Sequence, residues 1–251
     1  MSTLSAYSAK LPYAYAPGIY SSHALLDMNP SCAKRLLLHS SALQSEGCIT
    51  LQKRCEALGI RWEIADAALH RISRKENCYA AIVFEKVLSA LSGSDPHIVL
   101  QQPSDMGNLG TILRTCLGFS FVDIALIRPA ADLFDPRTVR ASMGALFGVR
   151  VQYFDAFEEY RDNYPAHLLY PFMLDGAPLH QMTSIPEEPY ALIFGNEAAG
   201  LPASFSQIGR PLRIAHSGRI DSLNLANAVS IGVYAFATLS RHQGGETDEL
   251  N

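Results

Sequence analysis

Short apolar segments that alternate with helical or polar stretches constrain the fold of this 251-residue chain more than any other feature of its sequence. In the C-terminal part each segment is four to eight residues long and almost entirely apolar. Strands of this kind, joined by helical crossovers, are typical of a parallel sheet that is covered on both faces. We therefore expect an α/β fold with a mainly parallel sheet, a last helix over residues 222–239, and strands over residues 97–100, 123–127, 150–153, 167–174, 190–194 and 212–215.

A polar stretch rich in Ser, Gly, Asp and Pro at residues 89–96 indicates a domain boundary. Before it, strands and helices are expected in the order βαβα with a final strand, over residues 35–38, 49–58, 61–64, 66–72 and 79–84. Residues 1–17 show no clean periodicity. The sequence thus predicts a tail (1–17), a smaller α/β domain (18–92) and a larger C-terminal domain (96–251).

Charge is divided unevenly between these parts. Residues 1–92 hold 10 Lys/Arg and 7 Asp/Glu, a net charge of +3, whereas residues 93–251 hold 10 and 17, a net charge of −7. This asymmetry indicates that the N-terminal domain meets an anionic partner. The net charge of −4 for the whole chain argues against a protein that coats nucleic acid without specificity.

The five cysteines are widely spaced and form no CxxC pair, which is typical of reduced thiols in a cytosolic protein and predicts no metal site. The N-terminus lacks the features of a signal peptide, and no apolar run approaches the roughly 18 residues of a membrane span. We expect a cytoplasmic protein without a membrane partner.

Three polar, glycine-bearing loops follow three of the expected strands, at residues 101–115, 195–202 and 216–224. Because ligands bind outside the carboxyl ends of parallel strands, these loops should enclose one pocket. Neither glycine-rich loop matches a dinucleotide or P-loop motif, and Glu197 would repel a polyphosphate. A ligand with a positive centre, or with hydrogen-bond donors, fits the loops better.

The same loops carry three motifs in fixed order and spacing. They read Asn108-x-Gly110-x-Ile112-x-Arg114-Thr115, then Phe194-Gly195-Asn196-Glu197-x-x-Gly200-Leu201, then Asp221-Ser222-Leu223-Asn224. From about residue 97 to residue 239 the chain resembles the SpoU (TrmH-like) RNA 2′-O-ribose methyltransferases of the SPOUT superfamily.

This resemblance implies a C-terminal deep trefoil knot that binds S-adenosyl-L-methionine (AdoMet), and a homodimer formed through the knotted domain. In such dimers the Asn and Arg of the first motif serve the cofactor of the other subunit. The substrate would be tRNA or rRNA, and the N-terminal domain resembles the L30e-type RNA-binding domain. The implied cofactor-binding residues are Gly195, Asn196, Gly200, Ile214, Gly218, Ser222 and Leu223.

The resemblance also implies catalytic roles for Arg114, Asn108, Glu197, Ser222 and Asn224. A guanidinium has a pKa above about 12 and no acceptor, so Arg114 is a poor base. We expect it to clamp a phosphate and stabilise the developing alkoxide, while the proton leaves to phosphate or water.

The other candidate residues have supporting roles. Asn108 would orient Arg114 or the ribose, and Glu197 would order the motif loops or hold Arg114. Ser222 and Asn224 would offer polar groups to the knot loop and the substrate, and Asp221 or Ser222 is expected to cap the last helix.

The sequence departs from the family pattern at Ala215, His216 and Asn227. These departures leave open a non-catalytic RNA-binding or ribosome-assembly protein with a degenerate methyltransferase fold. A small-molecule methyltransferase is a third possibility. Lys34, Arg35, Lys53 and Arg54, with residues 71–75, form either an ordinary solvated surface or an RNA-docking patch.

Overall fold

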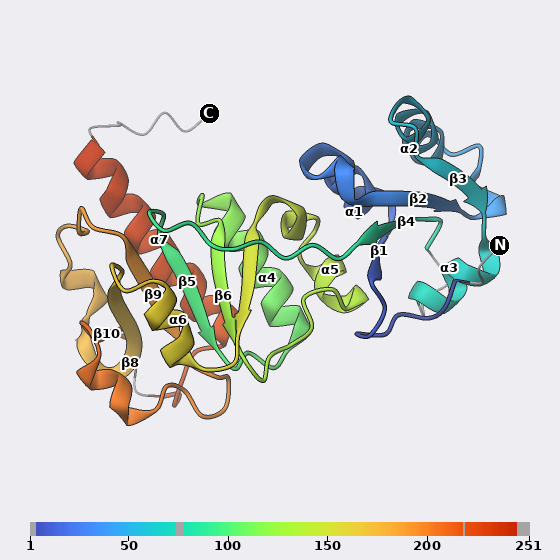
Figure 1. Cartoon of the computed structure of the whole chain (residues 1–251). Coiled ribbons are helices and arrows are strands. Elements are labelled where there is room, and N and C mark those ends of the chain that lie inside the picture. The colour runs from blue at the N-terminus through green and yellow to red at the C-terminus, as the bar shows by residue number, and fades with distance from the viewer. Residues whose placement is uncertain (1–3, 74–77, 218, 245–251) are drawn as a thin grey trace. The chain divides into compact units, whose positions relative to one another are not determined.

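A computed structural model describes residues 4–73, 78–217 and 219–244 of the chain (Figure 1). The chain divides into two compact units. The first unit comprises residues 1–87, 109–114 and 132–148, and the second comprises residues 88–108, 115–131 and 149–251.

The second unit is built on a six-stranded sheet in the order β10-β8-β9-β5-β6-β7, in which every neighbouring pair is parallel. The predicted α/β fold with a mainly parallel sheet is therefore confirmed. The strands are β5 (His97–Gln101), β6 (Asp123–Ile127), β7 (Arg150–Phe154), β8 (Leu168–Pro178), β9 (Tyr190–Phe194) and β10 (Leu212–Arg213).

Helices cover both faces of this sheet, as the unbroken apolar strands require (Figure 1). On one face α7 (Leu225–Gly244) packs Phe236 against Tyr170 and Tyr190. Beside it lies α4 (Met106–Gly118), joined to α7 by a hydrogen bond between the Thr115 and Ser230 hydroxyls. On the other face α6 (Phe157–Asn163) and the 3-10 turn η5 (Ala203–Gln207) pack Phe157 against Phe205.

Strand β8 is four residues longer than expected at its carboxyl end, and β10 is two residues shorter. Residues 175–178 (Asp-Gly-Ala-Pro) have the composition of a turn. They extend strand β8 instead, because β10 pairs with them. A Cβ atom on Gly176 would lie 2.5 Å from the carbonyl carbon of Leu212. Gly176 therefore allows the two strands to meet.

The first unit contains a four-stranded mixed sheet in the order β1-β4-β2-β3. Its strands are β1 (Tyr13–Pro17), β2 (Ala33–Leu38), β3 (Arg61–Ile64) and β4 (Ala80–Glu85), and its helices include α1 (Ile19–Met28), α2 (Glu46–Ala57) and α3 (Asp66–Ser73). The tail expected over residues 1–17 is thus wrong for Tyr13–Pro17, which pairs with β4 and buries Tyr15 completely. Residues 13–16 (Tyr-Ala-Tyr-Ala) form a short strand, but alanine at every second position gives no clear alternation of apolar and polar residues.

Residues 132–148 also belong to the first unit, although the sequence places them in the C-terminal domain. They form α5 (Pro136–Ala141) and the turn η3 (Ala145–Gly148). The ring of Phe84 packs against Phe134 and Phe147, with centroids 6.1 and 5.1 Å apart. Packing between aromatic rings that are so far apart in the chain cannot be recognised from local sequence.

A buried polar cluster closes the amino-terminal edge of the six-stranded sheet. His97 is fully buried, donates from Nε2 to the carbonyl of Ser92 (2.7 Å) and accepts at Nδ1 from the Tyr160 hydroxyl (3.0 Å). Its ring stacks on His167, with centroids 4.0 Å apart. Burial, reinforced by the neighbouring His167, lowers the pKa of His97 to about 4 against the opposing effect of Asp123 and Asp95.

We expect this cluster to make the protein sensitive to acid. Because unfolded His97 would titrate near pH 6.5, stability is retained above that pH and lost as the pH falls towards 4, by about 1.4 kcal/mol per pH unit. His97→Gln, which keeps a donor and an acceptor but cannot titrate, should flatten the pH dependence of the unfolding free energy in urea titrations. The exposed His180→Gln serves as the control, and an unchanged slope in His97→Gln would contradict the assignment.

Candidate functional site

The second and third motif loops line a cavity of about 490 Å³ at the carboxyl ends of β8 and β9. The first motif loop, which was expected to enclose the same pocket, contributes no lining residue among those that the structure describes. The volume of the cavity suits a ligand of cofactor size. Its wall combines backbone and side chains of the second and third motifs with the end of β8, namely Phe172–Asp175, Phe194–Leu201, Ala203, Ile214, His216, Asp221–Leu223, Leu225 and Ala228.

Glu197 joins the first motif loop to the second. Its carboxylate accepts hydrogen bonds from the Ser104 backbone N–H (3.1 Å) and hydroxyl (3.0 Å) and from the Asp105 N–H (3.2 Å). The amides of Asn108 and Asn196 complete the set at 3.4 Å each. With these donors around it, Glu197 orders the motif loops, and none of its hydrogen bonds to described residues involves Arg114.

The Glu197 carboxyl is held in its charged form. Partial burial alone would raise its pKa, but backbone N–H groups and the Ser104 hydroxyl bond to the carboxylate and lower the pKa below its usual value. Asp175 and Asp221 also line the cavity, while no Lys or Arg lines it among the described residues. The cavity is therefore suited to a ligand that carries positive charge.

Asn224 joins the third motif to the first and also begins α7. Its Nδ2 donates to the side-chain oxygen of Asn108 (3.0 Å), and its own side-chain oxygen accepts from the N–H of Ala226 (2.9 Å). The expectation that Asp221 or Ser222 caps the last helix is thus wrong, because α7 begins at Leu225 and Asn224 satisfies its first donors. Residues 222–224, which were expected to be helical, have no regular secondary structure.

The second motif loop folds tightly back on itself. Asn196 and Gly200 exchange two backbone hydrogen bonds of 3.2 and 2.9 Å, and Gly200 adopts φ +66°. A Cβ atom on Gly195 would lie 2.2 Å from the carbonyl carbon of Gly200. Only glycine at position 195 permits this loop shape.

Most of the residues proposed to bind the cofactor line this one cavity: Gly195, Asn196, Gly200, Ile214, Ser222 and Leu223. Gly218 lies outside the described residues. Of the remaining catalytic candidates, Glu197 lines the cavity, while Asn108 and Asn224 support its wall from outside the lining. Arg114 is an exposed residue of α4 and does not line the cavity of its own chain.

The end of β8 contributes lining residues that the sequence analysis missed. Phe172 stacks on Phe194 with centroids 4.3 Å apart, and Asp175 adds a carboxylate. The Asp-Gly pair after the apolar run was a usable signal, since it also stands at a strand's carboxyl end.

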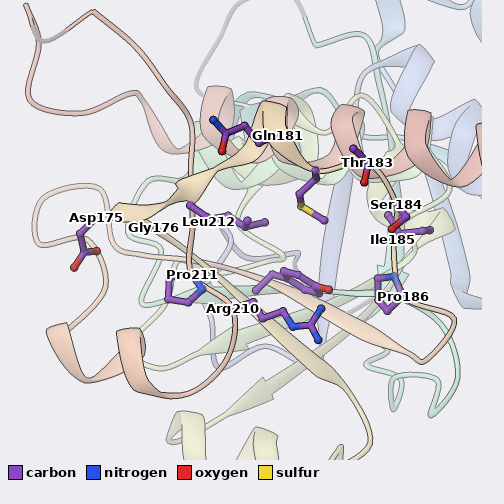
Figure 2. A pocket seen from close by; sticks show the side chains of 13 residues that line it. Asp175, Gly176, Gln181, Thr183, Ser184, Ile185, Pro186, Arg210, Pro211 and Leu212 are labelled. Atoms are coloured by element: carbon purple, nitrogen blue, oxygen red, sulfur yellow. The ribbon is translucent and has the colours of Figure 1, made fainter.

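A larger cavity of about 640 Å³ lies next to the first and shares only Asp175 with it. Asp175 and Pro186 stand on opposite sides of this cavity, and Arg210 also lines it (Figure 2). None of the three motifs contributes to its wall. We therefore assign the candidate site to the smaller cavity, where the motif residues meet.

The cations suggested for an RNA-docking patch are mostly paired with carboxylates. Lys34 pairs with Glu85 (2.6 Å), Arg35 with Glu63 (3.0 Å) and Arg54 with Asp27 (2.5 Å). Lys53 is exposed, and residues 74–77 are outside the described part. Each of the three paired cations thus faces a carboxylate in the free protein, with a side chain that is 32–52% exposed.

Within the described ranges, no group of three or more His, Cys, Asp or Glu side chains is placed to hold a metal ion. Across the same residues, no helix is both long enough and apolar enough to pass through a membrane.

Replacing Glu197 with glutamine should loosen the three loops together. The NH₂ group of glutamine would face the backbone N–H groups of Ser104 and Asp105, which donate to a carboxylate in the wild type. We therefore expect the free energy of unfolding to fall by about 1 kcal/mol and ligand binding at the cavity to weaken. Denaturant titration and calorimetry with AdoMet measure the two effects. Glu187→Gln, at an exposed position before β9, is the matched control, and equal behaviour of the two variants would contradict the role of Glu197.

Comparison with known proteins agrees with this geometry. The sequence model of the SpoU rRNA methylase family matches residues 95–234. The tRNA (cytidine(34)-2′-O)-methyltransferase of Escherichia coli is 32% identical over 148 residues, which cover 55% of this chain and 89% of that protein. The 23S rRNA (guanosine(2553)-2′-O)-methyltransferase of Bacillus subtilis is 32% identical over 149 residues, or 55% and 56% of the two chains.

A solved structure is similar over both units. The AdoMet-bound rRNA methyltransferase from Sinorhizobium meliloti superposes with a TM-score of 0.75 and 26% identity, over 92% of this chain and 88% of that one. Residues 95–234 contain all three motifs and the cavity, which the second and third motifs line. The chain belongs to the SpoU rRNA methylase family.

Proposed function

We propose that the protein transfers a methyl group from AdoMet to a ribose 2′-hydroxyl of RNA. The observation that carries this proposal is that the second and third motif loops line one cavity and are joined to the first motif loop by hydrogen bonds of Glu197, Asn108 and Asn224. Two relatives that are 32% identical to this chain, over 149 and 148 residues, are named RNA 2′-O-methyltransferases.

The charge and the volume of the cavity support AdoMet as its ligand. AdoMet carries a sulfonium and an ammonium group, and the wall offers the carboxylates of Asp175, Glu197 and Asp221. Backbone of the tight loop around Gly195 and of the segment at Ile214 and Leu223 would hold the nucleoside part. When bound, AdoMet supplies an electrophilic methyl carbon.

The chain's own residues then have to position the RNA and stabilise the charge that develops on the ribose oxygen. Arg114 suits this task, because its guanidinium can bind a phosphate and a developing alkoxide with two parallel donors. It cannot accept the hydroxyl proton, which we assign to phosphate or water. Ser222, at the rim of the cavity, would contact the substrate.

Arg114 would act on the cofactor of a second subunit, so we propose a homodimer formed through the C-terminal domain. Its absence from the lining of its own cavity supports this arrangement. So do the exposed side chains of Ile231 and Tyr234 on α7, which offer apolar area for a symmetric partner.

We further propose that the C-terminal segment forms the deep trefoil knot of the family. Two close approaches of the backbone support this. At the β8–β10 pair, the backbone of Leu212 lies where a side chain on Gly176 would be. A Cβ atom on Gly209 would likewise lie 2.2 Å from the carbonyl oxygen of Leu169. Glycine at both places lets one segment pass tightly against another.

Ribosomal RNA is our preferred target. A solved structure concerned with 2′-OH methylation of C/U34 on tRNA superposes on 62% of this chain, whereas the rRNA methyltransferase from S. meliloti superposes on 92%. We assign RNA reading to the first unit as an L30e-like domain. Its exposed aromatic side chains Tyr20, Trp62 and Tyr79 can stack on unpaired bases. An enzyme of RNA modification would work in the cytoplasm.

Methylation assays on ribosomal RNA and on tRNA transcribed in vitro test the proposal. Transfer to ribosomal RNA, reduced by Trp62→Ala, is the expected result. Point substitution is preferable to deletion of residues 1–87, because residues 132–148 pack within the same unit and would lose their partners. AdoMet binding without transfer to either RNA would favour the non-catalytic alternative.

A further inference from the structure

The carboxyl edge of the six-stranded sheet continues beyond the cofactor cavity as a hydrogen-bonded rim. Asn196, at the cavity, donates from Nδ2 to the carbonyl of Gln102 (2.7 Å). Gln102 in turn donates from its backbone N–H to Ile127 (3.1 Å) and from Nε2 to the carbonyl of Arg128 (3.3 Å). The rim therefore runs from β9 past β5 to the end of β6 without a break in its bonding.

Arg128 is the cation at the end of this rim. Its guanidinium carbon lies 4.4 Å from the centre of the Tyr153 ring, and its Nε lies 3.1 Å from the carboxylate of Asp155. The Tyr153 hydroxyl is itself fixed by a hydrogen bond to the carbonyl of Ala131 (3.1 Å). A flexible surface side chain is thus held in one place by a ring that is anchored at its far end.

The head of Arg128 remains available to a ligand. Its side chain is 52% exposed, and its carboxylate partner Asp155 is 88% exposed. An ion pair this open to water contributes little and exchanges readily for another anion. A guanidinium stacked on an aromatic ring keeps its edge donors free for bidentate contact with a phosphate.

We propose that Arg128, held on Tyr153, binds a backbone phosphate of the RNA strand that leads to or from the methylated nucleotide. This inference rests on the proposed function, because it extends the RNA path from the cavity along the same sheet edge. The second unit has a net negative charge and no lysine, so RNA contacts there depend on fixed arginines. Arg128 is a positioning residue and takes no part in methyl transfer.

The test compares Arg128→Ala with Arg161→Ala, a matched control on an exposed position of α6. Binding of a fluorescein-labelled single-stranded RNA is measured over a range of salt concentrations. Arg128→Ala should weaken RNA binding about tenfold and lower the slope of log affinity against log salt by about one. Arg128→Lys should retain the salt slope but bind more weakly than the wild type. Tyr153→Phe, which removes the hydrogen bond to Ala131, should weaken RNA binding less than Arg128→Ala does.

With ribosomal RNA as substrate, the same substitution should raise KM and leave kcat and AdoMet affinity unchanged. Equal RNA affinity and equal salt slope in Arg128→Ala and Arg161→Ala would overturn the proposal. Failure of the proposed function has a different signature: the wild type would transfer no methyl group, whatever the RNA affinity of the Arg128 variants.

Discussion

Replacing Arg114 with alanine is expected to lower the rate of methyl transfer to RNA by about 100- to 1000-fold, the usual effect of removing one donor to a developing negative charge. Arg114 is exposed on α4, and its guanidinium makes no ion pair among the described residues, so it is free to meet substrate. AdoMet affinity should stay at the wild-type value, because Arg114 does not line the cavity of its own chain. Initial rates with methyl-labelled AdoMet and calorimetry measure the two quantities.

Arg114→Lys separates charge from shape. Lysine keeps the positive charge but loses the planar pair of donors, so we expect partial activity. A wild-type rate in Arg114→Ala would remove this residue from the mechanism. Loss of AdoMet binding along with activity would instead point to a damaged fold.

Replacing Gly195 with alanine should change the shape of the cofactor cavity and weaken AdoMet binding at least tenfold. A tenfold loss of affinity corresponds to about 1.4 kcal/mol of binding free energy. The added methyl group would lie 2.2 Å from the carbonyl carbon of Gly200 and 2.4 Å from the nitrogen of Leu201. Both contacts are with backbone, so the loop has to open to relieve them. Calorimetry with AdoMet measures the affinity.

Gly93→Ala is the matched control, because a Cβ atom there would meet nothing within 4 Å. It should bind AdoMet as the wild type does. If Gly195→Ala also binds normally, the cavity is not the cofactor site.

Mixing the Arg114→Ala and Gly195→Ala variants, at an AdoMet concentration too low for Gly195→Ala to be occupied, tests whether Arg114 acts across a dimer. In a mixed dimer, the Gly195→Ala subunit would supply Arg114 to the intact cavity of the Arg114→Ala subunit. Random assembly would restore about a quarter of the wild-type activity. If Arg114 serves its own chain, no activity returns.

The catalytic half of the fold could be predicted because its strands are short, apolar and regularly spaced. Tyr190–Phe194 has the same bounds in the sequence analysis and in the structure, since five apolar residues lie between a proline-containing loop and a glycine. The place of the site followed from topology, because ligands bind outside the carboxyl ends of parallel strands and the cavity lies at the ends of β8 and β9.

Features set by distant packing could not be predicted. The strand Tyr13–Pro17 exists because β4 provides its partner, and residues 132–148 join the first unit through contacts with Phe84. The start of α7 depends on Asn224, whose side chain is positioned by Asn108 more than a hundred residues earlier. Local propensity carries no information about such partners.

The most direct test of the proposed function is the position of the transferred methyl group. Ribosomal RNA is incubated with the protein and methyl-labelled AdoMet, digested to nucleosides and separated by mass. We expect the label in a single 2′-O-methylated nucleoside, and its loss with Arg114→Ala. Label on a base, or AdoMet binding with no label in RNA, would contradict the assignment of this site to ribose methylation.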